Sequence, residues 1–182
     1  MLWRRIDLPG HELARLRAVD GGHELSGTAV FASQRGPAKL DYVVRCDAVW
    51  RTNSARVTGT VGERAVDVAV AADAARNWRL NGAERPSVAG ALDVDLGFSP
   101  ATNTLPIRRL ALAVGARAEV RAAWLPFPAL ELELLPQVYV RESETTLRYE
   151  SNGGRFVRTL AVDAAGFVTS YPGIWEAEPA PA

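Results

Sequence analysis

The sequence predicts a mainly β protein, built as an antiparallel curved sheet or barrel-like meander with one or two short helices. Short apolar runs rich in β-branched and aromatic residues recur through the 182-residue chain. Turn-forming Gly, Pro, Asn and Asp residues separate these runs at intervals of roughly 8–12 residues. Apolar and polar residues also alternate, as around Leu40, Tyr42, Val44 and Cys46, which indicates strands with one buried face.

The predicted strands follow one another on both sides of a central segment, residues 93–112. Before it they are Glu24–Ser33, Lys39–Cys46, Ala55–Val61, Ala65–Ala71 and Trp78–Leu80. After it they are Ala118–Leu125, Leu130–Arg141, Thr145–Glu150, Arg155–Val162 and Phe167–Ser170. The turn signals between strands include Asn81-Gly82, Asn152-Gly153-Gly154 and Asp163–Gly166.

Two segments are predicted to be helical. His11–Ala18 follows Pro9-Gly10 and carries leucines at helical spacing, although it is short. Pro106–Val114 is better marked, because Asn103 or Thr104 can cap it and Gly115 follows it. Alternating apolar residues within Pro106–Val114 leave a strand as the alternative.

Composition indicates one globular domain. Hydrophobic residues make up 48% of the chain, which is enough for a sizeable core. Since no internal repeat or linker is visible, residues 1–175 are predicted to form a single β-rich domain. The segment Glu176–Ala182, rich in Ala, Pro and Glu, is predicted to be a disordered tail.

Charge and apolar patterning argue against several classes of partner. The formal net charge is zero, so nucleic acid is not an expected partner. No apolar run reaches the roughly 18 residues that a membrane-spanning helix needs. Cys46 is the lone cysteine, and the N-terminus turns polar by Arg4, unlike a secretory signal. The expectation is therefore a cytoplasmic protein.

Sequence signatures of catalysis, metal binding and cofactor binding are not found. There is no Gly-x-Ser-x-Gly motif, and the histidines His11 and His23 lie in no His-Glu-x-x-His arrangement. The single lysine, Lys39, belongs to no phosphate-binding loop. No catalytic residue, metal ligand or cofactor is predicted.

Two pairs of carboxylates, Asp93/Asp95 and Glu131/Glu133, are spaced so that each pair shares one face of a strand. Such a pair can line a cavity and act as acid and base, or hold a divalent cation. The simpler interpretation is a solvated or salt-bridged strand face.

The central segment gathers polar groups that suit neither a plain strand nor a plain helix. Its candidate ligand-binding residues are Asp93, Asp95, Thr102, Asn103, Arg108 and Arg109. In one interpretation, the arginines fold back onto the aspartates and fix the loop through carboxylate–guanidinium pairs. In the other, the same groups bind a polar head group, since Asp and Asn bond to sugar hydroxyls and Arg binds phosphate or carboxylate.

Aromatic residues complete the set of candidate ligand-binding residues. The chain has five tryptophans, and we single out Trp78, Trp124 and Tyr139. Tryptophan and tyrosine present a flat apolar face with a polar edge, which suits contact with sugars and lipids. The competing interpretation for each of them is an ordinary core aromatic.

Several sequence words resemble the putative glycolipid-binding family of bacterial single-domain proteins, formerly a domain of unknown function. The most specific are Asp93–Leu96 (DVDL), Ser99–Leu110 (SPATNTLPIRRL), Trp124–Pro128 (WLPFP), Gln137–Tyr139 and Tyr171–Gly173. Further similar words are Pro9–Glu12, Leu40–Tyr42 and the closing Val162–Val168. The similar words occur in the expected order along nearly the whole chain.

The resemblance implies a mainly β, open or closed barrel-like sheet that binds an amphiphilic small molecule. We therefore expect a non-enzymatic glycolipid- or lipid-binding protein, with an apolar cavity in the curved sheet and a polar rim at Asp93–Arg109. Two alternatives stay open. One is an enzyme that acts on a glycosyl or acyl compound through Asp93 or Asp95. The other is a protein-interaction module with an exposed apolar patch.

Overall fold

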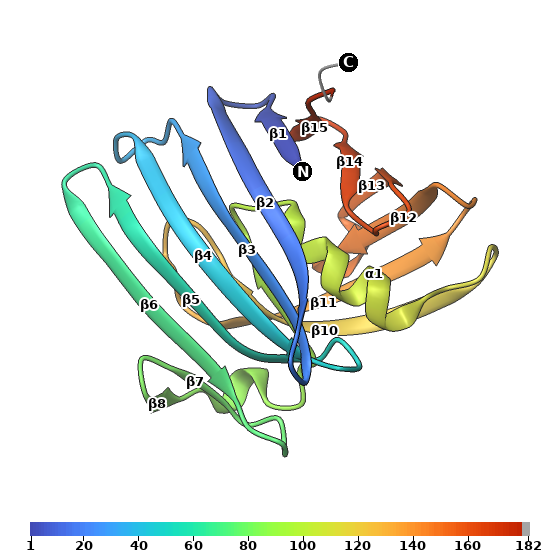
Figure 1. The fold of residues 1–182 in the computed structure, drawn as a ribbon, viewed down its shortest axis with the longest axis horizontal. Helices are drawn as coiled ribbons and strands as arrows, with labels where there is room; N and C mark the ends of the chain where they lie inside the picture. Colours follow the sequence, from blue (N-terminus) through green and yellow to red (C-terminus); the bar gives the residue numbers. More distant parts are fainter. Residues whose placement is uncertain (180–182) are drawn as a thin grey trace.

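The computed structural model describes residues 1–179 and consists of a single 15-stranded sheet with one short α-helix (Figure 1). The first eight strands are β1 (Leu2–Arg5), β2 (Gly10–Val19), β3 (Gly22–Phe31), β4 (Ala38–Asp47), β5 (Thr52–Val61), β6 (Arg64–Ala72), β7 (Trp78–Leu80) and β8 (Ala83–Glu84). The remaining strands are β9 (Asp93–Leu96), β10 (Arg117–Leu125), β11 (Glu133–Arg141), β12 (Thr146–Ser151), β13 (Phe156–Val162), β14 (Val168–Tyr171) and β15 (Trp175–Ala177).

Helical segments lie only between strands in the described part of the chain. The helix α1 spans Thr104–Leu110 and follows a short 3₁₀ turn at Ala101–Asn103. Two further 3₁₀ turns lie at Pro86–Val88 and Asn152–Gly154. No helix in residues 1–179 is long and apolar enough to cross a membrane.

The sheet is two meanders joined by the first and last strands. In space the order is β8 to β1 and then β15 to β9, so β1 and β15 are neighbours at the junction. Trp3 of β1 lies opposite Ala177 of β15 in an antiparallel pair. All other neighbours are also antiparallel except β9, which pairs with β10 in parallel. This confirms the predicted antiparallel curved sheet.

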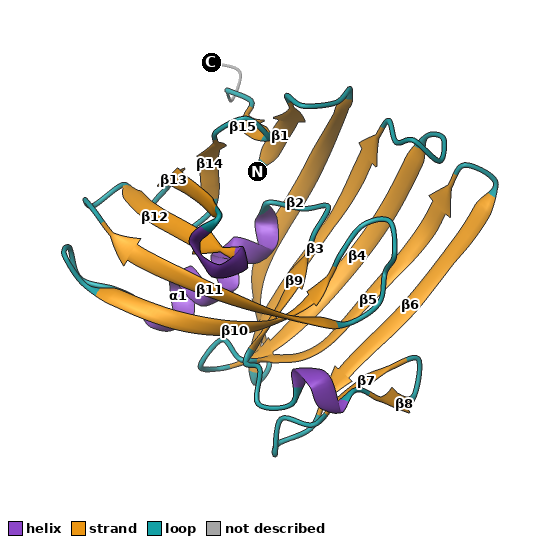
Figure 2. Cartoon of the chain, turned by 180° about the vertical axis from the view of Figure 1, so that it is seen from behind, coloured by secondary structure: helices purple, strands orange, loops and turns teal. Residues whose placement is uncertain are grey.

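The sheet curves strongly without closing into a barrel, because its end strands β8 and β9 do not pair with each other. Instead, the start of β9 meets the start of β5: the Thr52 amide donates to the Leu92 carbonyl over 2.9 Å. The Val94 amide in turn donates to Thr52 Oγ1 over 3.1 Å. Figures 1 and 2 show α1 between the β2–β6 half and the β9–β13 half of the sheet.

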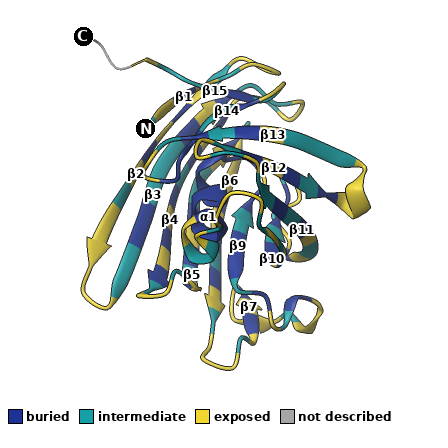
Figure 3. Cartoon of the chain, turned by 90° about the vertical axis from the view of Figure 1, so that its right-hand side faces the viewer, coloured by how far each residue is buried: buried dark blue, intermediate teal, exposed yellow. Residues whose placement is uncertain are grey.

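Burial explains the place of α1. The helix residues from Thr104 to Ile107 are all buried, and the 3₁₀ turn before them is buried as well. In Figure 3, α1 lies among the buried parts of the strands that surround it. Because α1 lies inside the curve of the sheet, it brings polar side chains from its own segment against β9 and β11.

The predicted helix at His11–Ala18 is wrong, because this segment lies within strand β2. Glu12 and Ala14 are buried while Leu13 is 58% exposed, which is the two-residue period of a strand. β2 also pairs with β3 from Gly10 to Val19 and with β1 from His11 to Leu13. These pairings with strands on both sides outweigh the leucine spacing that suggested a helix.

The second predicted helix exists but begins and ends earlier than expected. It ends at Leu110 rather than Val114, because Ala111 adopts a left-handed conformation with a φ of 43°. Asn103 is at the N-cap position but makes no side-chain capping bond there. At the other end of the chain, Glu176 and Ala177, assigned to the tail, belong to β15, and residues 180–182 lie outside the described structure.

Candidate functional site

A cavity of about 410 Å³ lies where the central segment meets strands β10 to β15. We call it the aromatic pocket. Its aromatic lining residues are Trp124, Tyr149, Phe156, Tyr171 and Trp175. Its polar lining residues are Asp95, Ser99, Asn103, Ser151 and Asn152. This combination of apolar walls with a few polar groups is typical of small-molecule sites.

Asp95 is the only acidic residue that lines the aromatic pocket. Strand β9 holds it half-buried, and its Oδ2 accepts a hydrogen bond of 2.6 Å from Gln137 Nε2. Burial raises the pKa of Asp95 to about 6; the Gln137 hydrogen bond lowers it, and nearby Asp93 raises it. Above that pH the carboxylate is an anionic acceptor at the pocket wall.

Hydrogen bonds between buried side chains fix the polar wall. Gln137 Nε2 also donates to the Tyr149 hydroxyl over 3.1 Å. The Tyr139 hydroxyl donates to Asn103 Oδ1 over 3.0 Å, which connects β11 to the turn before α1. Since each of these groups is held by another, the polar wall has a fixed arrangement.

The aromatic wall is built from edge-to-face contacts. The ring centroid of Tyr149 lies 6.1 Å from that of Phe156 and 6.1 Å from that of Tyr171, with interplanar angles of 76° and 69°. On the other side of the pocket, the Trp124 indole crosses closely over Gly97. A Cβ at Gly97 would lie only 2.7 Å from Trp124 Nε1, so glycine is needed there for the indole to keep its place.

A buried acid lies behind the aromatic pocket. Glu12 of β2 is 0% exposed, and its Oε1 accepts hydrogen bonds of 2.5 Å from both Ser99 and Tyr42. Its Oε2 has no hydrogen-bond partner among the described residues. Burial raises the pKa of Glu12 to about 8, although Ser99, Tyr42 and Arg5 act to lower it. Glu12 is therefore mostly protonated at neutral pH.

The predicted carboxylate–guanidinium pair exists between Asp93 and Arg109. Arg109 Nε and Nη2 bind the two Asp93 oxygens over 3.0 and 2.5 Å, in a bidentate pair. Asp93 is 1% exposed. Burial raises its pKa, and the charge of Arg109 acts in the opposite direction. The pair joins α1 to β9 and does not line the aromatic pocket.

Other candidate residues also lie outside the pocket. Arg108 is exposed, and its guanidinium lies 5.0 Å from the ring centroid of Trp50. Thr102 Oγ1 accepts the Leu96 amide over 3.2 Å, which fixes the turn. Trp78 is buried elsewhere and donates to the Ala91 carbonyl over 3.1 Å.

The second carboxylate pair does not gather at the pocket either. Glu131 and Glu133 are both exposed, and Glu131 pairs with Arg85 over 3.2 Å. Of the predicted ligand-binding residues, the structure brings Asp95, Asn103 and Trp124 into one pocket, with Tyr139 bonded behind them. No cluster of three or more metal-ligating side chains occurs in residues 1–179.

Sequence reasoning missed several residues of this region. They are Glu12, Tyr42, Ser99, Gln137, Tyr149, Phe156, Tyr171 and Trp175. Five of them lie in the sequence words that resemble the family, and this resemblance was the available signal. These five are Glu12, Tyr42, Ser99, Gln137 and Tyr171. Tyr149, Phe156 and Trp175 carried no comparable signal, because only the fold brings their strands together.

Comparison with known proteins identifies the family. The family model described as putative glycolipid-binding matches residues 1–177. The chain belongs to the putative glycolipid-binding family. The chain is also similar to a solved structure, the crystal structure of a DUF1089 family protein from Pseudomonas aeruginosa. The two chains are 36% identical, with a TM-score of 0.80 over 91% of each chain.

Membership in the glycolipid-binding family supports a binding role in general. It identifies neither a particular ligand nor a reaction. A search of curated proteins finds no match to this chain.

Proposed function

We propose that the protein binds a glycosylated amphiphile without chemical conversion, and that the aromatic pocket receives the sugar head group. The observation that carries this proposal is the convergence of five aromatic side chains and one half-buried carboxylate in one cavity. Aromatic faces contact the apolar faces of a sugar ring, while a carboxylate and an amide bind its hydroxyls.

The role of each polar residue depends on which of its hydrogen-bonding groups are still without a partner. Asp95 Oδ2 is occupied by Gln137, and its second oxygen has no partner among the described hydrogen bonds. That oxygen can accept a hydroxyl of the ligand. Asn103 uses its oxygen for Tyr139 and its Nδ2 for the Pro100 carbonyl, so its main task is to support the wall.

Apolar side chains in the same pocket can contact the first part of the ligand's alkyl chain. Leu135 and Ile174 line the cavity beside the aromatic rings. A cavity of about 410 Å³ is within the range of small-molecule sites. We infer that it encloses a head group and the first part of a chain, with the rest of the chain outside.

Titration with octyl glucoside, octanol and methyl glucoside tests the proposal. We expect octyl glucoside to bind more tightly than either part alone, because the pocket contacts both parts. Trp124→Ala is expected to weaken octyl glucoside binding about tenfold, as loss of a stacked aromatic does. Trp50→Ala, outside the pocket, is the matched control. Equal affinity for octanol and octyl glucoside would contradict the proposal that the aromatic pocket binds the sugar head group.

Native purification followed by solvent extraction and mass spectrometry identifies what the protein carries. A reproducible lipid that bears a sugar supports the proposal. Extracted lipids that all lack a sugar, or a sugar-bearing lipid bound equally by the Trp124→Ala variant, contradict it.

A hydrolase that uses Asp95 is the second candidate, because this carboxyl lies in a cavity, is not paired with arginine and has a raised pKa. Glycosidases use two carboxyls roughly 5–10 Å apart across the scissile bond. Asp95 has no second acidic residue with it in the pocket lining. Release of nitrophenol from nitrophenyl glycosides by the wild type, and its loss in Asp95→Asn, would favour the hydrolase.

A further inference from the structure

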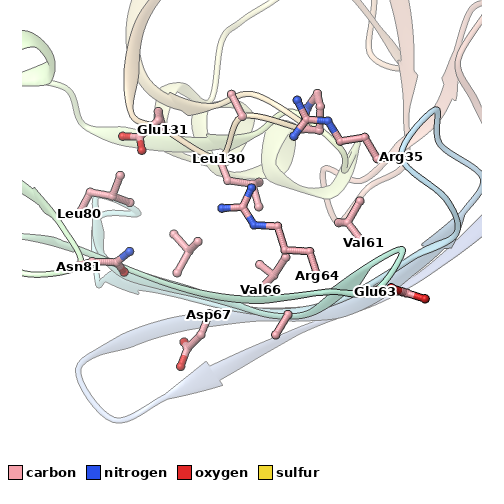
Figure 4. A pocket seen from close by; sticks show the side chains of 14 residues that line it. Arg35, Val61, Glu63, Arg64, Val66, Asp67, Leu80, Asn81, Leu130 and Glu131 are labelled. Atoms are coloured by element: carbon pink, nitrogen blue, oxygen red, sulfur yellow. The ribbon is translucent and has the colours of Figure 1, made fainter.

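A second cavity, of about 430 Å³, lies apart from the aromatic pocket and shares none of its lining residues. It lies between β6 and the segment that connects β10 to β11 (Figure 4). We call it the arginine groove, after Arg35 and Arg64, which line it. Neither the sequence motifs nor the family match assigns any role to it.

The arginine groove has an apolar floor and polar residues around it. Its floor is formed by Val61, Val66, Val68 and Leu80, all of which are buried. Alternation along β6 places Val66 and Val68 on the same side of the sheet. On the opposite side of the groove lies the loop 128–130, with Leu130 directed toward the floor (Figure 4). An alkyl chain in the groove would contact apolar groups on both sides.

Two arginines extend over this floor. In Figure 4, the Arg64 side chain rises from β6 toward Leu130, and Arg35 reaches in from the other end of the groove. Neither guanidinium forms an ion pair within the described part of the chain. Because no carboxylate of the described residues pairs with them, these two guanidinium groups are available to a ligand.

The acidic residues around the groove do not cancel this charge. Asp67 is on the opposite face of β6, where it pairs with Arg56 over 2.8 Å. Glu131 pairs with Arg85 over 3.2 Å. The carboxylate of Glu63 is directed away from the groove (Figure 4). The groove therefore presents two free positive charges above an apolar floor.

We propose that the arginine groove binds a single-chain amphiphile with an anionic head group, with the head between Arg35 and Arg64 and the chain along the valine floor. Guanidinium groups form charge-assisted hydrogen bonds with carboxylate and phosphate oxygens. A neutral sugar lipid gains nothing from these charges. This site is therefore additional to the aromatic pocket, and its ligand belongs to a different chemical class.

Calorimetric titration with dodecanoate, dodecyl phosphate and dodecyltrimethylammonium, each below its micelle concentration, tests the proposal. We expect dodecanoate or dodecyl phosphate to bind and the cationic surfactant to fail. The relative affinity of the two anions identifies the head group. Acetate and inorganic phosphate are expected to bind far more weakly, because they lack the chain. Equal binding of acetate and dodecanoate contradicts the proposed role of the floor.

Charge variants provide the decisive comparison. Arg35→Gln and Arg64→Gln are each expected to weaken binding of the anionic surfactant roughly fivefold, since both arginines are exposed to solvent. Arg64→Glu is expected to abolish that binding and to allow the cationic surfactant to bind. Arg15→Gln, an exposed arginine on β2 without an ion pair in the described structure, is the matched control.

The two sites can fail separately. Octyl glucoside binding is expected to stay unchanged in the Arg35→Gln/Arg64→Gln double variant, and dodecanoate binding to stay unchanged in Trp124→Ala. If the arginine variants bind dodecanoate like the wild type, the arginine groove is not the site. If Trp124→Ala alone abolishes dodecanoate binding, the anionic amphiphile occupies the aromatic pocket instead.

Discussion

The ionisation of Glu12 is strongly coupled to folding. It is fully buried, its pKa is raised to about 8, and one carboxyl oxygen has no partner among the described residues. In the unfolded chain the carboxyl ionises near its ordinary value of 4.5. Between these two values the folded protein keeps a proton that the unfolded chain has released. Stability must therefore fall as the pH rises through this window.

The Glu12→Gln variant is expected to lose this pH dependence. Between about pH 6.5 and about pH 8, the Glu12 contribution lowers the wild-type free energy of unfolding by about 2 kcal/mol. Glutamine is neutral and keeps an oxygen for Ser99 and Tyr42. Urea unfolding at both pH values measures the difference. If the free energy of unfolding changes equally with pH in the wild type and in Glu12→Gln, Glu12 ionises normally in the folded protein.

Asp95 is expected to make head-group binding pH-dependent. Its pKa of about 6 means that the carboxylate is ionised above this pH and protonated below it. A protonated carboxyl is a weaker acceptor for sugar hydroxyls. Octyl glucoside affinity should therefore decline as the pH falls from about 7 to about 5. Asp95→Asn should bind more weakly and show no decline, and an equal decline in the variant would exclude Asp95 as the cause.

The Asp93–Arg109 pair is expected to be a structural requirement. Arg109→Ala leaves a carboxylate that is 1% exposed without its partner. Loss of one member of a buried pair typically costs about 3–5 kcal/mol of stability. Arg108→Ala removes the contact of an exposed guanidinium with the Trp50 ring, and about 0.5–1 kcal/mol is expected. Thermal unfolding measures the stability of the two variants, whose substitutions are neighbours in one helix. Similar losses of stability in both would contradict the structural role of the pair.

At the scale of elements, local alternation predicted most of the sheet correctly. Strands β3 to β6 and β10 to β14 lie where the alternating apolar runs placed them. The failure at β2 shows the limit of this signal. Leu13 and Leu16 are at helical spacing, but the buried residues of β2 include Glu12 and Ala14, which no hydrophobic pattern selects. Only the neighbouring strands determine that β2 is extended.

The terminal strands β1 and β15 escaped prediction for a related reason. β1 and β15 contain four and three residues, too few to show a period. Their structure depends on each other, across the full length of the described chain. The same holds for the site: the sequence marked Asp93 and Asp95 alike, and only the position of α1 decides which one binds arginine and which faces the pocket.

The end of α1 offers a prediction at this scale. Ala111 terminates the helix in a left-handed conformation with a φ of 43°, and its side chain is exposed. Glycine adopts this conformation without the steric cost of a Cβ. Ala111→Gly is therefore expected to raise the free energy of unfolding by about 0.5–1 kcal/mol. Ala113→Gly, also exposed, is expected to lower it or leave it unchanged. A loss of stability in Ala111→Gly would contradict the left-handed geometry.

At the scale of the whole molecule, one open sheet carries two chemically different cavities. The aromatic pocket belongs to the β9–β15 half, and the floor of the arginine groove belongs to β5, β6 and β7. Composition could not predict this separation, because zero net charge conceals where the unpaired arginines lie. The loop 128–130 of the β9–β15 half forms the opposite side of the arginine groove, so this groove lies between the two halves of the sheet.

The pairing of β1 with β15 bears on how the protein is made. The ribosome produces β1 first, and β2 is soon available to pair with one of its edges. Its other edge has no partner until β15 has been synthesised, after every other strand. An unpaired strand edge can recruit other chains. A nascent chain of this protein therefore remains vulnerable to aggregation until β15 has been synthesised, and chaperones that shield strand edges should raise its yield.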